Sequence, residues 1–100
     1  MNVLDQIIER KKEEVAAAKS KIPISQFKNS EFFHRENLSL KESLKAKSGI
    51  IAEFKRKSPS KGLINREADV LEVTKSYENF GASGISVLTD FDFFAGSVQD

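Results

Sequence analysis

The hydrophobic positions of this chain form two short apolar runs on either side of a segment with helical spacing. The first run follows Gly49 and the second lies in residues 84–90; both are short, β-branched and bounded by turn residues, as strands are. Between them, within residues 65–80, apolar and half-apolar side chains recur at i, i+3, i+4 and i+7: Val70, Val73, Thr74 and Tyr77. Gly81 follows, where a glycine often ends a helix. The pattern predicts strand, helix, strand, which is a βαβ unit of the α/β class with parallel strands.

More helical signals precede the first strand. Residues 2–19 carry a narrow apolar stripe on a mostly polar helix, which Asn2 and Asp5 would cap at its N-terminus. One turn separates Arg10 from Glu14, so the two can pair. We expect this helix to lie on a surface.

A capping box marks a second helix. Ser39 is followed three residues later by Glu42, which predicts a short helix that ends near Ala46. We expect residues 21–37 to be an ordered but irregular connection. After the second strand we expect a loop over residues 91–96, and then a new helix start at Ser97 and Asp100.

The predicted elements divide the chain into a helical extension, residues 1–48, and a βαβ unit, residues 49–100. Two parallel strands do not normally make a stable sheet alone, because parallel sheets are covered on both faces. We therefore expect a fragment of a larger βα protein, or a chain that completes itself by association. Uncovered strand edges and apolar faces predict self-association or pairing with the missing part.

Composition narrows the class of protein. The chain has 100 residues, 39% hydrophobic and 31% charged, which is typical of a soluble globular chain and allows one small domain at most. No apolar run is long enough to cross a membrane, and the N-terminus does not have the pattern of a secretory signal. Cysteine is absent, which excludes a disulfide scaffold or a thiolate metal site and fits a cytoplasmic location. A net charge of +1 does not indicate a nucleic-acid binder.

The candidate chemistry lies at the end of the first strand. Side chains two apart in a strand share a face, so Glu53 and Lys55 should lie together, opposite Ala52 and Phe54. Opposite charges at the C-terminal end of an apolar strand indicate a functional site, because an unpaired buried charge is costly. The following loop, residues 56–62, is rich in Lys, Ser and Gly, which suit an anion.

Other interpretations of the same residues remain open. Glu53 and Lys55 could simply reach water, and the segment that starts at Ser58 could be only a turn. Phe94 could be a core residue. The basic tract, residues 55–61, could form a nucleic-acid or other anion-binding module, although it is joined to an apolar strand. A phosphate-binding P-loop does not fit, because no glycine precedes the lysine at the required spacing.

Residues 51–62, IAEFKRKSPSKG, resemble the signature of the indole-3-glycerol-phosphate synthase family. Residues 81–97 resemble the second strand of that family with the loop after it, and residues 7–15 its helical segment ahead of the barrel. The resemblance implies a (β/α)8 TIM barrel, about 250 residues long, with extra N-terminal helices. This chain would supply those helices, the first two barrel strands and the helix between them.

The resemblance also implies a reaction. The family converts 1-(2-carboxyphenylamino)-1-deoxyribulose 5-phosphate into indole-3-glycerol phosphate, with release of carbon dioxide and water, in tryptophan biosynthesis. It implies a small phosphorylated substrate and no cofactor, metal, nucleic acid or membrane.

Five residues take roles from the resemblance. Lys55 would bind the substrate carboxylate and position the ring for closure, and Glu53 would contact the polar centre of the substrate. Ser58 would donate a hydrogen bond to the phosphate. Pro59 and Phe94 would form apolar walls around the aromatic ring. The principal general acid and general base of the family belong to the third and fourth strands, so we expect this chain to be inactive alone.

Overall fold

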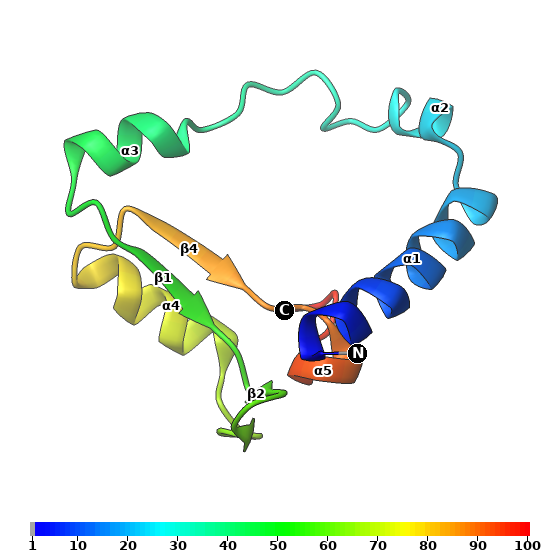
Figure 1. Cartoon of the computed structure of the whole chain (residues 1–100). Coiled ribbons are helices and arrows are strands. Elements are labelled where there is room, and N and C mark those ends of the chain that lie inside the picture. Colours follow the sequence, from blue (N-terminus) through cyan, green and yellow to red (C-terminus); the bar gives the residue numbers. More distant parts are fainter. Residues whose placement is uncertain (1) are drawn as a thin grey trace. The chain divides into compact units, whose positions relative to one another are not determined.

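The computed structural model describes residues 2–100, which form two compact units: the first ends at Asn37, and the second covers Leu38–Asp100 (Figure 1). The boundary between the two units precedes the helix predicted after Ser39, so this helix is in the same unit as the two strands. The predicted division into a helical extension, residues 1–48, and a barrel unit, residues 49–100, refers to a complete barrel and stays a prediction.

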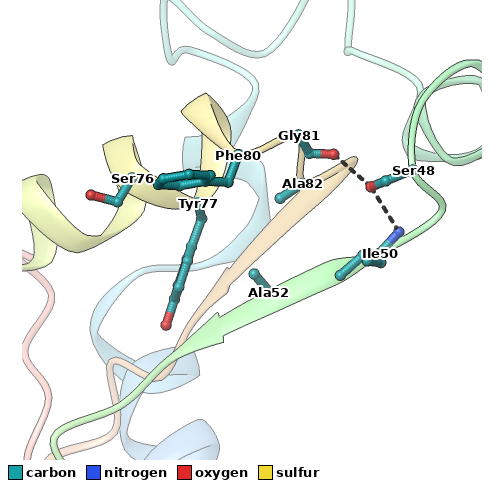
Figure 2. Close-up of a pocket in the computed structure, with 8 residues that line it drawn as sticks. All are labelled: Ser48, Ile50, Ala52, Ser76, Tyr77, Phe80, Gly81 and Ala82. Carbon is teal, nitrogen blue, oxygen red and sulfur yellow. Dashed lines mark hydrogen bonds between the residues drawn. The ribbon is translucent and has the colours of Figure 1, made fainter.

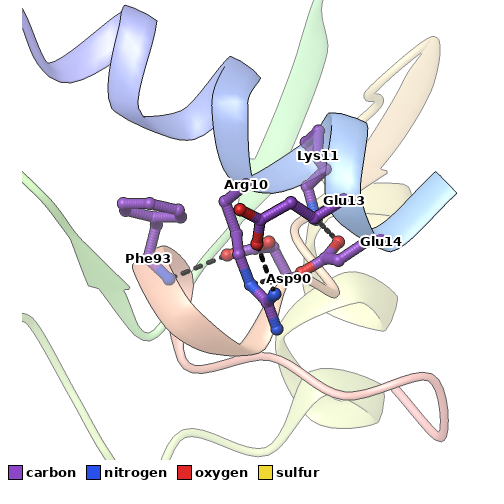
Figure 3. A network of polar contacts seen from close by, with 6 residues as sticks. All are labelled: Arg10, Lys11, Glu13, Glu14, Asp90 and Phe93. Atoms are coloured by element: carbon purple, nitrogen blue, oxygen red, sulfur yellow. Dashed lines mark hydrogen bonds and ion pairs between the residues drawn. The ribbon is translucent and has the colours of Figure 1, made fainter. Parts of the chain in front are cut away.

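The first unit is built on helix α1, Val3–Lys21. The Asn2 side chain accepts a hydrogen bond from the Asp5 backbone N–H at 2.8 Å, so the predicted cap is confirmed. The predicted pair between Arg10 and Glu14 is present at 3.5 Å, and Figure 3 shows both side chains with Lys11 and Glu13 of the same helix. No side chain of α1 is buried, as expected for a surface helix.

A short helix interrupts the connection that was predicted to be irregular. Helix α2, Ile24–Phe27, begins directly after Pro23, whose φ is −65°. Proline fixes φ near this value and favours the residues that follow as a helix start. The prediction of an irregular segment is therefore wrong for these four residues.

The second unit begins with helix α3, Leu40–Ala46. The Ser39 hydroxyl accepts a hydrogen bond from the Glu42 backbone N–H at 3.1 Å, which confirms the predicted N-terminal cap. Strand β1, Ile51–Phe54, and strand β4, Gly84–Val87, then form a parallel pair (Figure 1). The α/β class and the βαβ unit are confirmed.

The intervening helix α4 is shorter than predicted. It covers Val70–Asn79, five residues later than the expected start at Asn65. The Asp69 carboxylate caps it, accepting the N–H of Leu71 at 2.9 Å and of Glu72 at 3.3 Å. The Asn65 side chain instead accepts the Glu67 N–H at 3.1 Å, a turn that competes with helix.

The end of α4 follows the prediction. Gly81 has a φ of +94°, which glycine adopts without strain. Its N–H donates to the Glu78 carbonyl and that of Ala82 to the Tyr77 carbonyl, both at 3.0 Å. These are the two bonds of a Schellman motif, so the helix ends where the sequence placed its stop.

Two small elements were not predicted. Strands β2, Lys57–Ser58, and β3, Gly62–Leu63, form an antiparallel hairpin within the loop after β1. Helix α5, Phe91–Phe94, occupies most of the predicted loop after β4 and is capped by Asp90 (Figures 1 and 3). Each element is four residues or shorter, below the length at which periodicity can be detected.

The two faces of the β1–β4 pair differ. Phe54, 3% exposed, is the one buried hydrophobic residue among those described. On the face of Ile50 and Ala52, α4 packs and leaves an apolar groove of about 350 Å³ (Figure 2). Glu53 lies on the opposite face, as the alternation of a strand requires. Within residues 2–100 no helix is long and apolar enough to cross a membrane.

Candidate functional site

The C-terminal end of β1 brings Glu53 and Lys55 together. The Lys55 Nζ lies 3.5 Å from the Glu53 Oε1, so the predicted common side of the strand is confirmed. Their side chains are 37% and 46% exposed for Lys55 and Glu53 respectively. The pair is therefore reachable by a small molecule.

Strand β4 contributes a third polar side chain. The parallel register sets Ser86 opposite Glu53, and the Ser86 hydroxyl donates to the Glu53 Oε2 at 3.3 Å. On the other side, the Tyr77 hydroxyl of α4 donates to the Glu53 backbone carbonyl at 3.2 Å. These contacts hold Glu53 from two elements: β4 binds its carboxylate, and α4 binds its backbone carbonyl. Sequence reasoning missed both, because it gave no register between the strands.

This arrangement can bind a polar, anionic group. A lysine ammonium beside a carboxylate that is already held by a hydroxyl offers a fixed positive charge with an acceptor next to it. A partly exposed ion pair contributes little stability. The pair places charge at the C-terminal edge of the sheet, where parallel-strand proteins have their sites.

Ser58 lies in the β2–β3 hairpin and is buried. Its hydroxyl oxygen accepts the Lys61 backbone N–H at 3.2 Å and lies 3.5 Å from the Ser60 hydroxyl oxygen. Pro59 is exposed at the tip of this turn. The turn interpretation of Ser58 is thus supported, while its predicted contact with a phosphate stays a prediction.

Phe94 belongs to helix α5 and is half-buried. Helix α5 contacts β2, so the loops that follow the two strands lie against each other. Between them is a groove of about 450 Å³ whose lining includes Lys57, Leu63 and Phe91. The predicted roles of Pro59 and Phe94 as pocket walls stay predictions.

An ion pair that the sequence did not reveal lies next to these residues. Arg56 and Asp100 form two hydrogen bonds, at 2.6 and 3.1 Å, and are 17% and 10% exposed. The hydrogen bond to Asp100 raises the pKa of Arg56 and, reciprocally, lowers the pKa of Asp100 below its ordinary value; desolvation opposes both shifts. No sequence signal could have found this pair, because the partners are 44 positions apart.

Within residues 2–100 no group of three or more His, Cys, Asp or Glu side chains could hold a metal ion.

Comparisons with known proteins decide the family. The family model of indole-3-glycerol phosphate synthase matches residues 4–100. The chain belongs to the indole-3-glycerol phosphate synthase family. Among curated proteins of that name, the Carboxydothermus hydrogenoformans protein is 41% identical over 96% of this chain. Those of Bacteroides thetaiotaomicron and Bacillus cereus (strain ATCC 10987 / NRS 248) are 45% and 46% identical over 99% and 98%.

The match covers only part of each relative. This indole-3-glycerol phosphate synthase segment corresponds to their N-terminal portion and spans 36–39% of their length. The resemblance stated from residues 51–62, 81–97 and 7–15 is confirmed.

Proposed function

We propose that this chain is the N-terminal part of an indole-3-glycerol phosphate synthase and supplies the first two strands of a (β/α)8 barrel. The family membership and the parallel β1–β4 pair support this architecture. The complete enzyme would close the ring of carboxyphenylamino-deoxyribulose phosphate, releasing carbon dioxide and water. The observation that carries the proposal is the Glu53–Lys55 pair at the C-terminal edge of β1.

Each residue then has a physical task. The Lys55 ammonium binds the substrate carboxylate and holds the aromatic ring near the carbonyl that it attacks. Glu53 keeps that ammonium in place and contacts the polar centre of the substrate. Ser58 donates to the phosphate, and Pro59 with Phe94 forms the apolar wall. The general acid and base come from the remainder of the barrel.

The runner-up, a basic nucleic-acid or anion-binding module, is less consistent with the structure. Arg56, in the middle of the basic tract, is mostly buried and bound to Asp100, so its charge is already neutralised. Lys55 is paired with Glu53. A nucleic-acid surface requires exposed, unpaired cations along a face.

A fusion protein tests the function directly. In it, this chain replaces the matching 100 residues of the Bacteroides thetaiotaomicron relative, whose remaining barrel follows. Turnover of the carboxyphenylamino substrate is followed by the indole fluorescence of the product. We expect turnover by the fusion protein and none by this chain alone.

The unmodified relative is the positive control, and binding of DNA at several salt concentrations tests the runner-up. A folded fusion protein without turnover contradicts the proposed function. Salt-dependent DNA binding by this chain favours the basic module instead. The ligand of this chain would then be a polyanion such as DNA, and not a small phosphorylated molecule of the cytoplasm.

A further inference from the structure

Arg56 stands between the candidate catalytic Lys55 and the hairpin that carries Ser58, and all three guanidinium nitrogens are engaged. Its Nη1 and Nη2 donate to the two carboxylate oxygens of Asp100 at 2.6 and 3.1 Å. Its Nε donates to the Ala68 carbonyl at 3.1 Å. A two-pronged contact of this kind fixes orientation as well as distance.

The backbone of Arg56 is engaged too. Its carbonyl accepts the N–H of Ile64 at 2.8 Å and that of Asn65 at 3.1 Å, which closes the hairpin where β3 ends. The guanidinium carbon lies 5.1 Å from the centre of the buried Phe54 ring at the end of β1. The residue therefore contacts the strand end, the hairpin exit and the segment ahead of α4.

Asp100 extends these contacts to the other loop. Besides binding Arg56, its Oδ2 accepts the Ser97 backbone N–H at 3.0 Å. The segment after α5 is thereby folded into a turn that faces the guanidinium. One ion pair links the loop after β1 to the loop after β4.

We propose that Arg56, held by Asp100, is a positioning residue for the site. It fixes the strand end that presents Lys55 and the hairpin that presents Ser58, and it makes the two loops move as one body. This inference rests on the proposed function for its catalytic meaning, while the positioning itself is a property of this chain. Arg56 touches no substrate in this assignment and acts through its neighbours.

The chemistry requires arginine and not merely a positive charge. A lysine at this position keeps the charge but can neither bind both Asp100 oxygens in one plane nor reach the Ala68 carbonyl at the same time. Arg56→Lys thus separates orientation from charge. Asp100→Asn, which keeps the shape of the side chain and removes the charge, tests the same link from its other end.

Amide hydrogen exchange on this chain measures the positioning. In Arg56→Lys, we expect the Ile64, Asn65 and Lys61 amides to exchange on the order of tenfold faster, because their loop has lost its anchor. Arg35→Lys is the matched control, since Arg35 lies 5.9 Å from the Phe32 ring centre but forms no ion pair within residues 2–100. Unchanged exchange in both Arg56→Lys and Asp100→Asn overturns the inference.

Kinetics of the fusion protein measure the catalytic consequence. We expect Arg56→Lys to lower kcat and raise KM, with kcat/KM roughly ten- to a hundredfold lower, because displacement by about an ångström has effects of this size. Normal kcat and KM per folded molecule, with only a lower Tm, would show a structural residue and overturn the proposal. If Arg56→Lys does not fold, Asp100→Asn decides by the same criteria.

The proposed function and the positioning role of Arg56 can be contradicted independently. A fusion protein that is inactive without any substitution contradicts the proposed function, and the exchange measurement then still decides whether Arg56 holds the loops. Faster exchange with unaltered kinetics of an active fusion protein contradicts the positioning role alone.

Discussion

At the N-terminal end of the β1–β4 pair, three serines tie the chain together, whereas at the C-terminal end charged side chains do so. The Ser43 hydroxyl donates to the Ser83 carbonyl at 2.6 Å, and the Ser48 hydroxyl to the Gly81 carbonyl at 2.5 Å. The Ser83 hydroxyl accepts the Gly49 N–H at 2.8 Å. At the other end, the ion pairs of Lys55 and Arg56 take the place of these neutral bonds.

The difference indicates a division of labour between stability and function. Short neutral side chains that bond to the backbone lose little conformational entropy, and no charge has to be desolvated. They therefore suit the N-terminal end of the strand pair, where the contacts only stabilise the fold. Charged pairs lose more solvation and gain less stability. The charged pairs at the C-terminal end are consistent with the proposal that Lys55 binds an anionic ligand there and that Arg56 positions this lysine.

The largest expected effect is on catalysis and belongs to the charged end. In the fusion protein, Lys55→Ala should lower kcat/KM about 100-fold or more, because it removes a positioned charge, with the fold unchanged by circular dichroism. Lys45→Ala, on helix α3 near the serine end, is the control and should leave kcat/KM unaltered. Near-native turnover by Lys55→Ala removes Lys55 from its assigned role.

The next effect is on stability and belongs to the serine end. Ser83→Ala leaves the Gly49 N–H without its acceptor, which should lower the free energy of unfolding of this chain by about 1–3 kcal/mol in urea titrations. Ser20→Ala, whose exposed hydroxyl bonds only within α1, should change it by less than about 0.5 kcal/mol. If Ser83→Ala lowers kcat per folded molecule of the fusion protein, the serine end also affects catalysis. That result would contradict the separation of stability and function between the two ends.

A smaller effect separates the two roles considered for Ser58. If its hydroxyl binds the substrate phosphate, Ser58→Ala in the fusion protein should raise KM roughly fivefold with little change in kcat, because such a contact is equally strong in ground and transition states. Ser60→Ala, in the same turn, is the control. Faster exchange of the Lys61 amide without a change in KM would assign Ser58 to the turn alone.

The smallest expected effect is a pH dependence that only the charged end should show. The lowered pKa of Asp100 means that its ion pair with Arg56 stabilises this chain fully above the ordinary carboxyl value, about 3.9, and is lost as pH falls through the lower folded value. The stability difference between the unmodified chain and Asp100→Asn should therefore shrink below about pH 4. The difference caused by Ser83→Ala should stay constant, and parallel behaviour of the two variants would contradict the comparison.

The sequence predicted what depends on local signals. The caps at Asn2 and Ser39, the stop at Gly81 and the common side of Glu53 and Lys55 each follow from residues within a few positions of one another. The start of α4 was misplaced because two competing signals, at Asn65 and Asp69, lie four residues apart and only one of them forms the cap.

What escaped prediction depends on contacts across the chain. Ser86 reaches Glu53 only because the parallel register sets them side by side, and Arg56 meets Asp100 only after both loops have folded back. In the sequence, Arg56 is one basic residue in a tract of lysines, and nothing distinguishes its role from theirs. Only the folded structure shows that Arg56 binds Asp100.

One contact gives this chain an optical use. Tyr77 is its single tyrosine and there is no tryptophan, so its near-ultraviolet signal comes mainly from one phenol. That phenol donates to the backbone carbonyl of Glu53, and it sits where α4 meets β1. The ultraviolet spectrum of the unlabelled chain therefore reports directly whether the helix is docked behind the candidate carboxylate.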